Sequence, residues 1–477
     1  MLKPPSDALL QGLESVLGPR GFSRDPKDLE PWLTDWRGRY TGAAAALLSP
    51  GSTAEVCEVV ARAAAEGVAL VPQGGNTSMV GGATPGTQGT ALLVSLRRLN
   101  RIRAVSADDN VLVAEAGVSL SQVHDAAEAA DRRFPLSLGA KGSATIGGLI
   151  STNAGGTQVL RFGSMRALVL GLEAVLPDGS LYEGLSALRK DNRGYDLRQL
   201  LVGAEGTLGI VTAASLRLVA RPGSRAVAWA GLATPQDALH LLRHLEARLG
   251  DTVEGFELVP DHALGLVLRH TPGTRPPLGG AHPWHVLIES AAPSGAPDAA
   301  DGLGKALGEA LESGIAADAV IAASEAQADA LWRLRETISE AERQEGPSLK
   351  HDISVPVSGM PALMDEARFA VETHYPGSRV VAFGHLGDGN IHFNVQAPAD
   401  SHQPVWLRDT GPHVSAFIYD LVTAAGGSIS AEHGIGQMKL ADYMRTASPV
   451  QLAAQRAIKS ALDPAGIMNP GKLFPLT

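Results

Sequence analysis

Four glycine-rich stretches spaced along the first half of the chain constrain its fold more than any other feature. They cover residues 72–82, 139–157, 161–163 and 203–212. Glycine lets the backbone approach another group closely and leaves N–H groups accessible to a phosphate. Side-chain packing seldom needs so many glycines in loops, whereas wrapping a long ligand that carries a pyrophosphate does. The pattern therefore predicts one cofactor-binding domain over residues 1–220.

A small βαβ unit is predicted at the start of this domain. Ser52 and Glu55 have the spacing of a capping box, apolar residues then recur with helical period, and Gly67 can end the helix before the strand at 68–72. A Rossmann unit would need a G-x-G-x-x-G sequence, which is absent, and the next element, residues 90–96, reads as another strand. The familiar dinucleotide-binding fold is therefore excluded.

Alternating apolar and polar residues predict further strands at 168–184 and 208–219, the first folded into a hairpin at Pro177-Asp178-Gly179. A connector at Arg221-Pro222-Gly223-Ser224 ends the glycine pattern. Beyond it, helices are expected at 235–250 and 323–344, and strands at 285–290 and 352–358. This mixture predicts a second α+β domain.

Charge and cysteine content narrow the class of protein. The chain has 477 residues, a net charge of −10 and no block of five like charges, so neither nucleic acid nor an anionic membrane is an expected partner. Its single cysteine, Cys57, excludes an intramolecular disulfide and fits a reducing compartment. No apolar run reaches the length of a membrane span. We expect a cytoplasmic protein without a membrane span.

Two histidines flank an Asp-Gly pair in FGHLGDGNIHFNV, residues 383–395. Asp388-Gly389 favours a two-residue hairpin turn, in which His385 would pair with His392, and alternation places Asn394 on the face of His392. Directly opposed imidazoles can share a metal ion, although a pair of solvated histidines is equally compatible with the hairpin. A third ligand must come from elsewhere, and the neighbouring Glu432 and His433 in SISAEHGIGQ offer a carboxylate and an imidazole.

Several ordered motifs together resemble the flavin-linked D-2-hydroxy acid dehydrogenases of the vanillyl-alcohol oxidase superfamily. They are PQGGNTS, GAKGSATIGG, STNAGGT, RKDNRGYDLRQLLVGAEGTLGIVT, GHLGDGNIHFNV, AEHGIG and NPGKL. The resemblance implies an α+β fold, with an FAD-binding domain of two α+β subdomains over 1–220. It further implies a substrate or cap domain built on an antiparallel sheet over 221–425, and a C-terminal segment over 426–477 that returns to the flavin.

The resemblance also implies the residues of the site. His385, His392 and Glu432 would bind a divalent metal, most often zinc, and His433 would be the general base. Because Asn76 and Ala144 stand in the glycine loops and Cys57 lies on a predicted helix, we expect noncovalent FAD. The residues expected to contact FAD are Pro72, Gly74, Gly75, Asn76, Thr77, Ser78, Gly142, Ser143, Ile146, Gly147, Thr152, Asn153, Gly155, Gly156, Glu205, Gly206, Ile210 and Asn469.

A hydroxy acid needs groups that hold its carboxylates. Arg335 and Ser339 are four residues apart on a predicted helix, but Arg333 and Thr337 have the same spacing, so the pattern alone cannot choose between them. A solvated charged face is also compatible with this helix. The resemblance selects Arg335, Ser339 and Lys350 for the distal carboxylate of a dicarboxylic substrate, with Asn394 as a further substrate contact.

The expected reaction is therefore oxidation of a D-2-hydroxydicarboxylate, with D-2-hydroxyglutarate first and D-malate second, to the 2-oxo acid. Hydride would pass to FAD and electrons to an acceptor other than NAD, for which electron-transfer flavoprotein and a quinone are both compatible. D-lactate dehydrogenase and the glycolate oxidase flavoprotein subunit are the nearest alternatives. A metallohydrolase or a non-catalytic flavin-binding subunit would be alternatives of a different class. The family also makes a homodimer an expectation.

Overall fold

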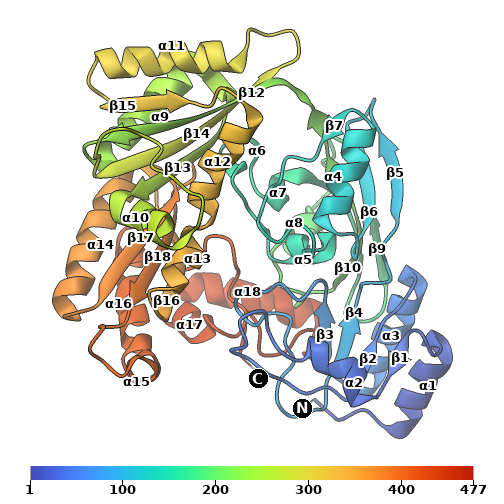
Figure 1. Cartoon of the computed structure of the whole chain (residues 1–477). Helices are drawn as coiled ribbons and strands as arrows, with labels where there is room; N and C mark the ends of the chain where they lie inside the picture. Colours follow the sequence, from blue (N-terminus) through green and yellow to red (C-terminus); the bar gives the residue numbers. More distant parts are fainter. Residues whose placement is uncertain (1, 476–477) are drawn as a thin grey trace. The chain divides into compact units, whose positions relative to one another are not determined.

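The computed structural model describes residues 2–475 and divides the chain into two compact units (Figure 1). Unit 1 contains residues 1–156, 163–220 and 432–477, and unit 2 contains residues 157–162 and 221–431. Among the described residues, no helix is both long enough and apolar enough to cross a bilayer.

Unit 1 contains two main sheets with helices packed against them. A four-stranded sheet has the order β1-β2-β4-β3, in which β2, β4 and β3 are parallel, and a five-stranded antiparallel sheet has the order β5-β6-β10-β8-β9. The strands are β1 Phe22–Ser23, β2 Ala46–Leu48, β3 Leu70–Gln73, β4 Leu92–Ser95, β5 Ile102–Ser106, β6 Val111–Glu115, β8 Val169–Val175, β9 Leu181–Gly184 and β10 Ile210–Arg217, with β7 Arg132–Arg133 and β11 Val219–Ala220 forming a small ribbon.

The helices of unit 1 complete two α+β subdomains, so the predicted fold class is confirmed. Helices α1 and α3 contact each other in the first subdomain, and α4 and α5 contact the five-stranded sheet in the second. Their bounds, with those of the shorter helices, are α1 Asp7–Leu17, α2 Pro26–Leu29, η1 Glu30–Trp32, α3 Thr53–Glu66, α4 Leu120–Ala129, α5 Ile146–Ser151, α7 Met165–Leu168, α8 Leu197–Leu201, α17 Leu440–Thr446 and α18 Pro449–Leu462.

Unit 2 is built on one seven-stranded sheet in which every neighbouring pair is antiparallel. The order is β15-β12-β14-β13-β17-β18-β16. The strands are β12 Pro222–Leu232, β13 Val253–Pro260, β14 Trp284–Pro293, β15 Asp318–Ile321, β16 Ser348–Ser354, β17 Arg379–His385 and β18 Asn390–Gln396. This antiparallel sheet confirms the architecture that was expected of the second domain.

Helices cover both faces of this sheet, since β13 is buried at all eight positions. One face packs against α10, α12 and α13 in a core that includes Trp229 and Phe383. The other helices contact the same strands and one another (Figure 1). The helices of unit 2 are α6 Val159–Phe162, α9 Pro235–Leu249, η2 Gly250–Thr252, α10 Asp261–His270, α11 Ala299–Glu312, α12 Glu325–Glu336, α13 Ile338–Arg343, η3 Val357–Gly359, α14 Met360–His374, α15 Gln403–Asp409 and α16 Gly411–Ala424.

Candidate active site

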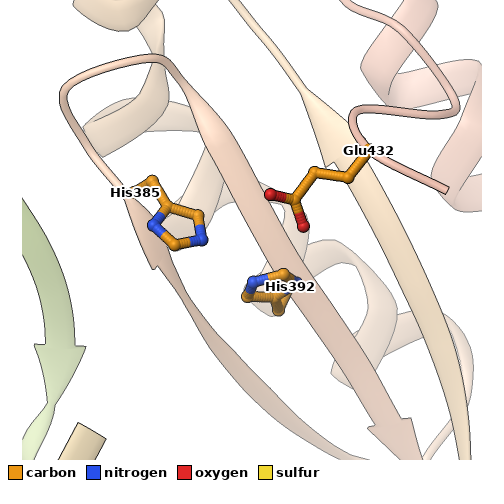
Figure 2. Close-up of side chains that lie close together, drawn as sticks. All are labelled: His385, His392 and Glu432. Atoms are coloured by element: carbon orange, nitrogen blue, oxygen red, sulfur yellow. The ribbon is translucent and has the colours of Figure 1, made fainter. Parts of the chain in front are cut away.

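Three residues expected to bind a metal come together in the structure. His385 ends β17, His392 lies on β18, and Glu432 directly follows Ala431 of unit 2. One possible ligand atom from each lies within 4.8 Å of the other two, and Figure 2 shows the carboxylate directed toward the two imidazoles. Two imidazole nitrogens and one carboxylate suit zinc or a similar divalent ion and leave coordination positions for a substrate. The donor set therefore fits a metal of this kind.

The hairpin that carries the histidines has a different register from the predicted one. His385 pairs with Asn390, and His392 pairs with Phe383, so the two histidines are diagonal neighbours across four loop residues. The reason is that Leu386 is buried and its N–H donates to the Phe256 carbonyl of β13 instead of continuing the hairpin ladder. A shift of two residues keeps each side chain on its face. The imidazoles therefore still meet, with ring centroids 5.4 Å apart.

The loop before Glu432 is tied to the edge strand β16. Ser354 and Ser428 exchange two backbone hydrogen bonds of 3.0 and 2.7 Å, and the N–H of Ala431 donates to the Asp352 carbonyl at 3.3 Å. Asp352 pairs directly with His392 on β18. Hydrogen bonds to β16 thus fix the backbone at Ala431, the residue before Glu432, close to the strand position of His392.

A buried carboxylate that was not predicted from the sequence contacts the metal group, the name used here for His385, His392 and Glu432. Glu257 on β13 accepts a hydrogen bond from His385 Nδ1 at 2.5 Å and an ion pair from Arg335 at 2.8 Å. Burial alone would raise the pKa of Glu257, but the charges of His385 and Arg335 outweigh burial and lower it to about 2. An ionised carboxylate only accepts, so Nδ1 carries the proton and Nε2 is the nitrogen that can bind a metal.

Replacing Glu257 with glutamine should weaken metal binding by about 10- to 100-fold, the usual effect of losing a hydrogen-bond partner of a ligating histidine. The measurement is competition between the FAD-containing protein and a chromogenic chelator. Glu289→Gln is the matched control, because Glu289 is another mostly buried carboxylate of this sheet that contacts Arg225 and Trp332 instead of a histidine. Equal metal affinity in the Glu257 variant and wild type would show that Glu257 does not orient His385.

The four residues expected to hold the substrate lie in different environments. Arg335 is buried, while Ser339 is exposed. The single helix predicted over 323–344 is interrupted at Thr337, whose hydroxyl donates to the Arg333 carbonyl at 2.7 Å. The same carbonyl also accepts the backbone N–H of Thr337 at 3.2 Å, and this residue ends α12 and precedes α13.

Lys350 and Asn394 are cross-strand partners on β16 and β18. Both donate to the same carboxylate, that of Glu342 on α13, with the Lys350 bond at 2.5 Å and the Asn394 bond at 2.7 Å. Sequence reasoning missed Glu342, because one glutamate in ISEAERQE looks like any solvated charge of a helix. No periodic pattern distinguishes it.

In unit 1, the first two glycine loops approach each other backbone to backbone. A Cβ at Gly75 would lie 1.8 Å from the Ser143 carbonyl oxygen, and one at Gly74 would lie 2.2 Å from Thr145 Oγ1. Only glycine permits this approach. Of the other predicted cofactor residues, Pro72 lies on β3, Ile146 and Gly147 begin α5, and Ile210 begins β10 after Gly206 in the stretch 203–212. The remaining ones lie in the first two glycine stretches outside these elements: Thr77, Ser78, Gly142, Thr152, Gly155 and Gly156.

Some of the residues expected to contact the cofactor have a left-handed backbone, as do Asn110, Asp131 and Leu473 elsewhere in the chain. Asn76, Asn153, Glu205 and Asn469 all have positive φ, from 41° to 54°. Strained residues of this kind cluster at ligand sites. Within the described chain, the buried atoms Thr145 Oγ1 and Asn469 Oδ1 accept or donate no hydrogen bond. Closely approaching glycine backbone and buried polar atoms without a partner are features that fit the binding of a long, phosphate-bearing cofactor.

The loop that carries His433 is anchored by Glu205. The buried Glu205 carboxylate accepts from the backbone N–H groups of Ile435 and Gly436, both at 2.7 Å. Burial raises the pKa of Glu205, although these two donors oppose the rise. The turn needs Gly434, since its φ is 80° and a Cβ there would lie 2.8 Å from Glu205. The side chain expected to contact the cofactor therefore fixes the backbone directly after His433.

Comparisons with known proteins agree with this arrangement. Residues 44–184 match the family described as FAD binding domain, and residues 221–473 match the family described as FAD linked oxidases, C-terminal domain. The chain is 40% identical over 469 residues to a D-2-hydroxyglutarate dehydrogenase from Xanthomonas citri pv. viticola, covering 98% of this chain and 97% of the relative. It is 38% identical to the mitochondrial D-2-hydroxyglutarate dehydrogenase of Bos taurus, covering 98% of this chain and 83% of the relative.

Solved structures show the same fold at low sequence identity. Alkyldihydroxyacetonephosphate synthase has a TM-score of 0.72 at 15% identity and covers 98% of this chain and 86% of its own. Substrate-bound p-cresol methylhydroxylase has a TM-score of 0.72 at 15% identity and covers 98% of this chain and 97% of its own.

The fold and the two family matches together define a flavoprotein of the FAD-linked oxidase class. Within that class, the chain belongs to the flavin-linked D-2-hydroxy acid dehydrogenases of the vanillyl-alcohol oxidase superfamily. The family expected from the motifs, and FAD as the cofactor, are therefore confirmed.

Proposed function

We propose that this protein is an FAD- and metal-dependent dehydrogenase that oxidises a D-2-hydroxydicarboxylate to the 2-oxo acid. D-2-hydroxyglutarate is the first substrate proposed, because the relatives with 36–40% identity include several D-2-hydroxyglutarate dehydrogenases. D-malate is the second. The observation that carries the metal part of the proposal is the group of His385, His392 and Glu432, with His433 adjacent in sequence.

The chemistry divides among the residues of the chain. When bound, FAD supplies the acceptor for hydride, and a divalent ion on the three ligands supplies Lewis acidity at the substrate hydroxyl. The imidazole of His433 takes the hydroxyl proton as the C–H bond at the α-carbon breaks. Glu257 holds His385 in the tautomer that a ligand needs. Arg335, Lys350, Asn394 and Ser339 would bind the substrate carboxylates.

The domain roles follow from the same proposal. Residues 1–220 would bind FAD without a covalent bond, residues 221–425 would bind the substrate, and residues 426–477 would return to the flavin with His433. The electron acceptor would be electron-transfer flavoprotein or a quinone. Location in the cytoplasm and a homodimer stay predictions.

Product analysis in steady-state turnover tests the proposal. The purified protein, loaded with FAD and zinc, is incubated with an artificial electron acceptor and D-2-hydroxyglutarate, D-malate, D-lactate or glycolate. The L isomers of the three chiral acids are the controls. We expect 2-oxo acid to form in proportion to reduced acceptor, with the D-dicarboxylates turned over faster than glycolate. A higher rate with D-lactate or glycolate than with either dicarboxylate would instead favour a D-lactate dehydrogenase or a glycolate oxidase subunit.

A further inference from the structure

Glu342 is a buried carboxylate among the residues proposed to bind the substrate. Its side chain, on α13, is 0% exposed. Oε2 accepts from Lys350 Nζ at 2.5 Å and from Asn394 Nδ2 at 2.7 Å. Both donors belong to the proposed substrate site, so the carboxylate sits where the far end of a substrate would be bound.

The register of the sheet fixes how far Glu342 lies from the metal group. Lys350 pairs with Asn394, and Asp352 pairs with His392, on the same face of β16 and β18. Two residues along a strand correspond to about 6.5–7 Å. This spacing matches a short 2-hydroxy acid whose hydroxyl lies at the metal group and whose distal end lies at Lys350. Glu342 therefore contacts the distal end of the site.

The cations expected to attract a second carboxylate already face buried carboxylates. Lys350 is paired with Glu342, and Arg335 is paired with Glu257. A distal carboxylate that binds at Lys350 would also meet the negative charge of Glu342, and repulsion between like charges is strong where water is excluded. A lysine without a neighbouring carboxylate would favour substrates with a second carboxylate. Because Glu342 is paired with Lys350, this preference is reduced.

One oxygen of Glu342 also needs a donor. Within the described residues, the buried Oε1 accepts no hydrogen bond. A buried acceptor without a partner is costly, so a ligand that supplies a donor at this point gains affinity. A distal carboxylate supplies only acceptors, whereas a carboxamide supplies an N–H group for Oε1 and a carbonyl oxygen for Lys350.

We propose that Glu342 determines specificity by lowering the preference for a second carboxylate, so that the site also accepts D-2-hydroxy acids whose distal group is neutral and donates a hydrogen bond. The inference rests on the proposed function and extends its substrate class. D-2-hydroxyglutarate remains a substrate, and its distal monoamide becomes a comparable one.

The test compares these two substrates, which have nearly the same shape and differ in distal charge. In wild type, their kcat/KM values should agree within about tenfold. Glu342→Gln removes the negative charge and keeps the size, and it should shift the ratio toward the dicarboxylate by about tenfold or more. Glu340→Gln is the matched control. It removes the same charge from the same helix, but at a side chain that is 62% exposed instead of buried. That control should leave the ratio unchanged.

The outcomes separate this inference from the proposed function. If no D-2-hydroxy acid is oxidised by the wild-type protein, the proposed function fails. If wild type oxidises D-2-hydroxyglutarate but discriminates against the amide by more than about tenfold, the proposed role of Glu342 is overturned. This outcome needs only the wild-type protein, so it holds even if the variant does not fold. An unchanged ratio in a folded, FAD-containing Glu342→Gln protein would overturn it as well.

Discussion

Replacing His433 with alanine lowers the rate of substrate-dependent flavin reduction by about 10²- to 10⁴-fold, the range expected when a general base is lost. His433 follows Glu432, a proposed metal ligand, and Glu205 accepts hydrogen bonds from the backbone of Ile435 and Gly436. Glu205 bonds to backbone N–H groups that the substitution does not remove, so the variant should keep its FAD. Rapid mixing under anaerobic conditions, with flavin absorbance as the signal, measures the rate.

His413→Ala is the control for this substitution. His413 is an exposed histidine on α16, and its loss makes the same chemical change away from the metal group. This variant should reduce flavin at the wild-type rate. If the His433 variant also did so, the proton would have to leave through another group, and the assignment of His433 as base would be abandoned.

Removing the divalent metal from the FAD-loaded protein lowers turnover of D-2-hydroxyglutarate by about 100-fold or more, since Lewis acidity at the substrate oxygen supplies several kcal/mol. The flavin spectrum should persist, because the proposed metal ligands His385, His392 and Glu432 lie outside the glycine loops. Dialysis against a chelator, elemental analysis and turnover assays before and after adding zinc measure the effect.

His392→Ala separates a functional metal from an incidental one. This variant should contain little metal, turn over slowly and show no recovery when zinc is added. Its thermal unfolding temperature and FAD content control for misfolding. Full turnover by wild-type protein from which the metal has been removed would contradict the metal part of the proposed function.

Local sequence signals predicted local structure well. The helix starting after Ser52 and ending at Gly67 was predicted with its capping residues, and α3 has Ser52 accepting from the Glu55 N–H and Gly67 in the left-handed region. The apolar residues that recur with helical period in this segment are buried: Val56, Val59, Val60 and Ala63. These features depend on residues within one or two helical turns, so a single segment contains the information.

The histidine hairpin shows where local signals stop. Alternation correctly predicted that His385 and His392 share a face, because the side-chain period of a strand is two. The pairing was wrong because Leu386 bonds to Phe256, which lies about 130 residues earlier in the chain. A contact with a third strand cannot be read from the turn itself.

The two buried carboxylates of the candidate site, Glu257 and Glu342, differ in how much the sequence says about them. Glu257 and Glu254 both stand in an apolar strand, VEGFELVP, where a charged residue is a usable signal of a buried partner. Glu342 offers no such signal, since it lies in a charged helical segment and becomes buried only because α13 packs against the sheet of unit 2. The sequence therefore indicates the groups proposed to react, while the buried carboxylates proposed to position them or to select the substrate require the structure.

Anaerobic single-turnover reduction of the bound flavin by D-2-hydroxyglutarate tests the central claim most directly. The protein is loaded with FAD and zinc, mixed with substrate in the absence of oxygen, and analysed for flavin absorbance and 2-oxo acid. The proposed function predicts rapid bleaching with one 2-oxo acid formed per flavin, no bleaching by the L isomer, and loss of bleaching after the metal is removed. An oxidised flavin that persists with the D isomer, in protein shown to contain both FAD and metal, would contradict it.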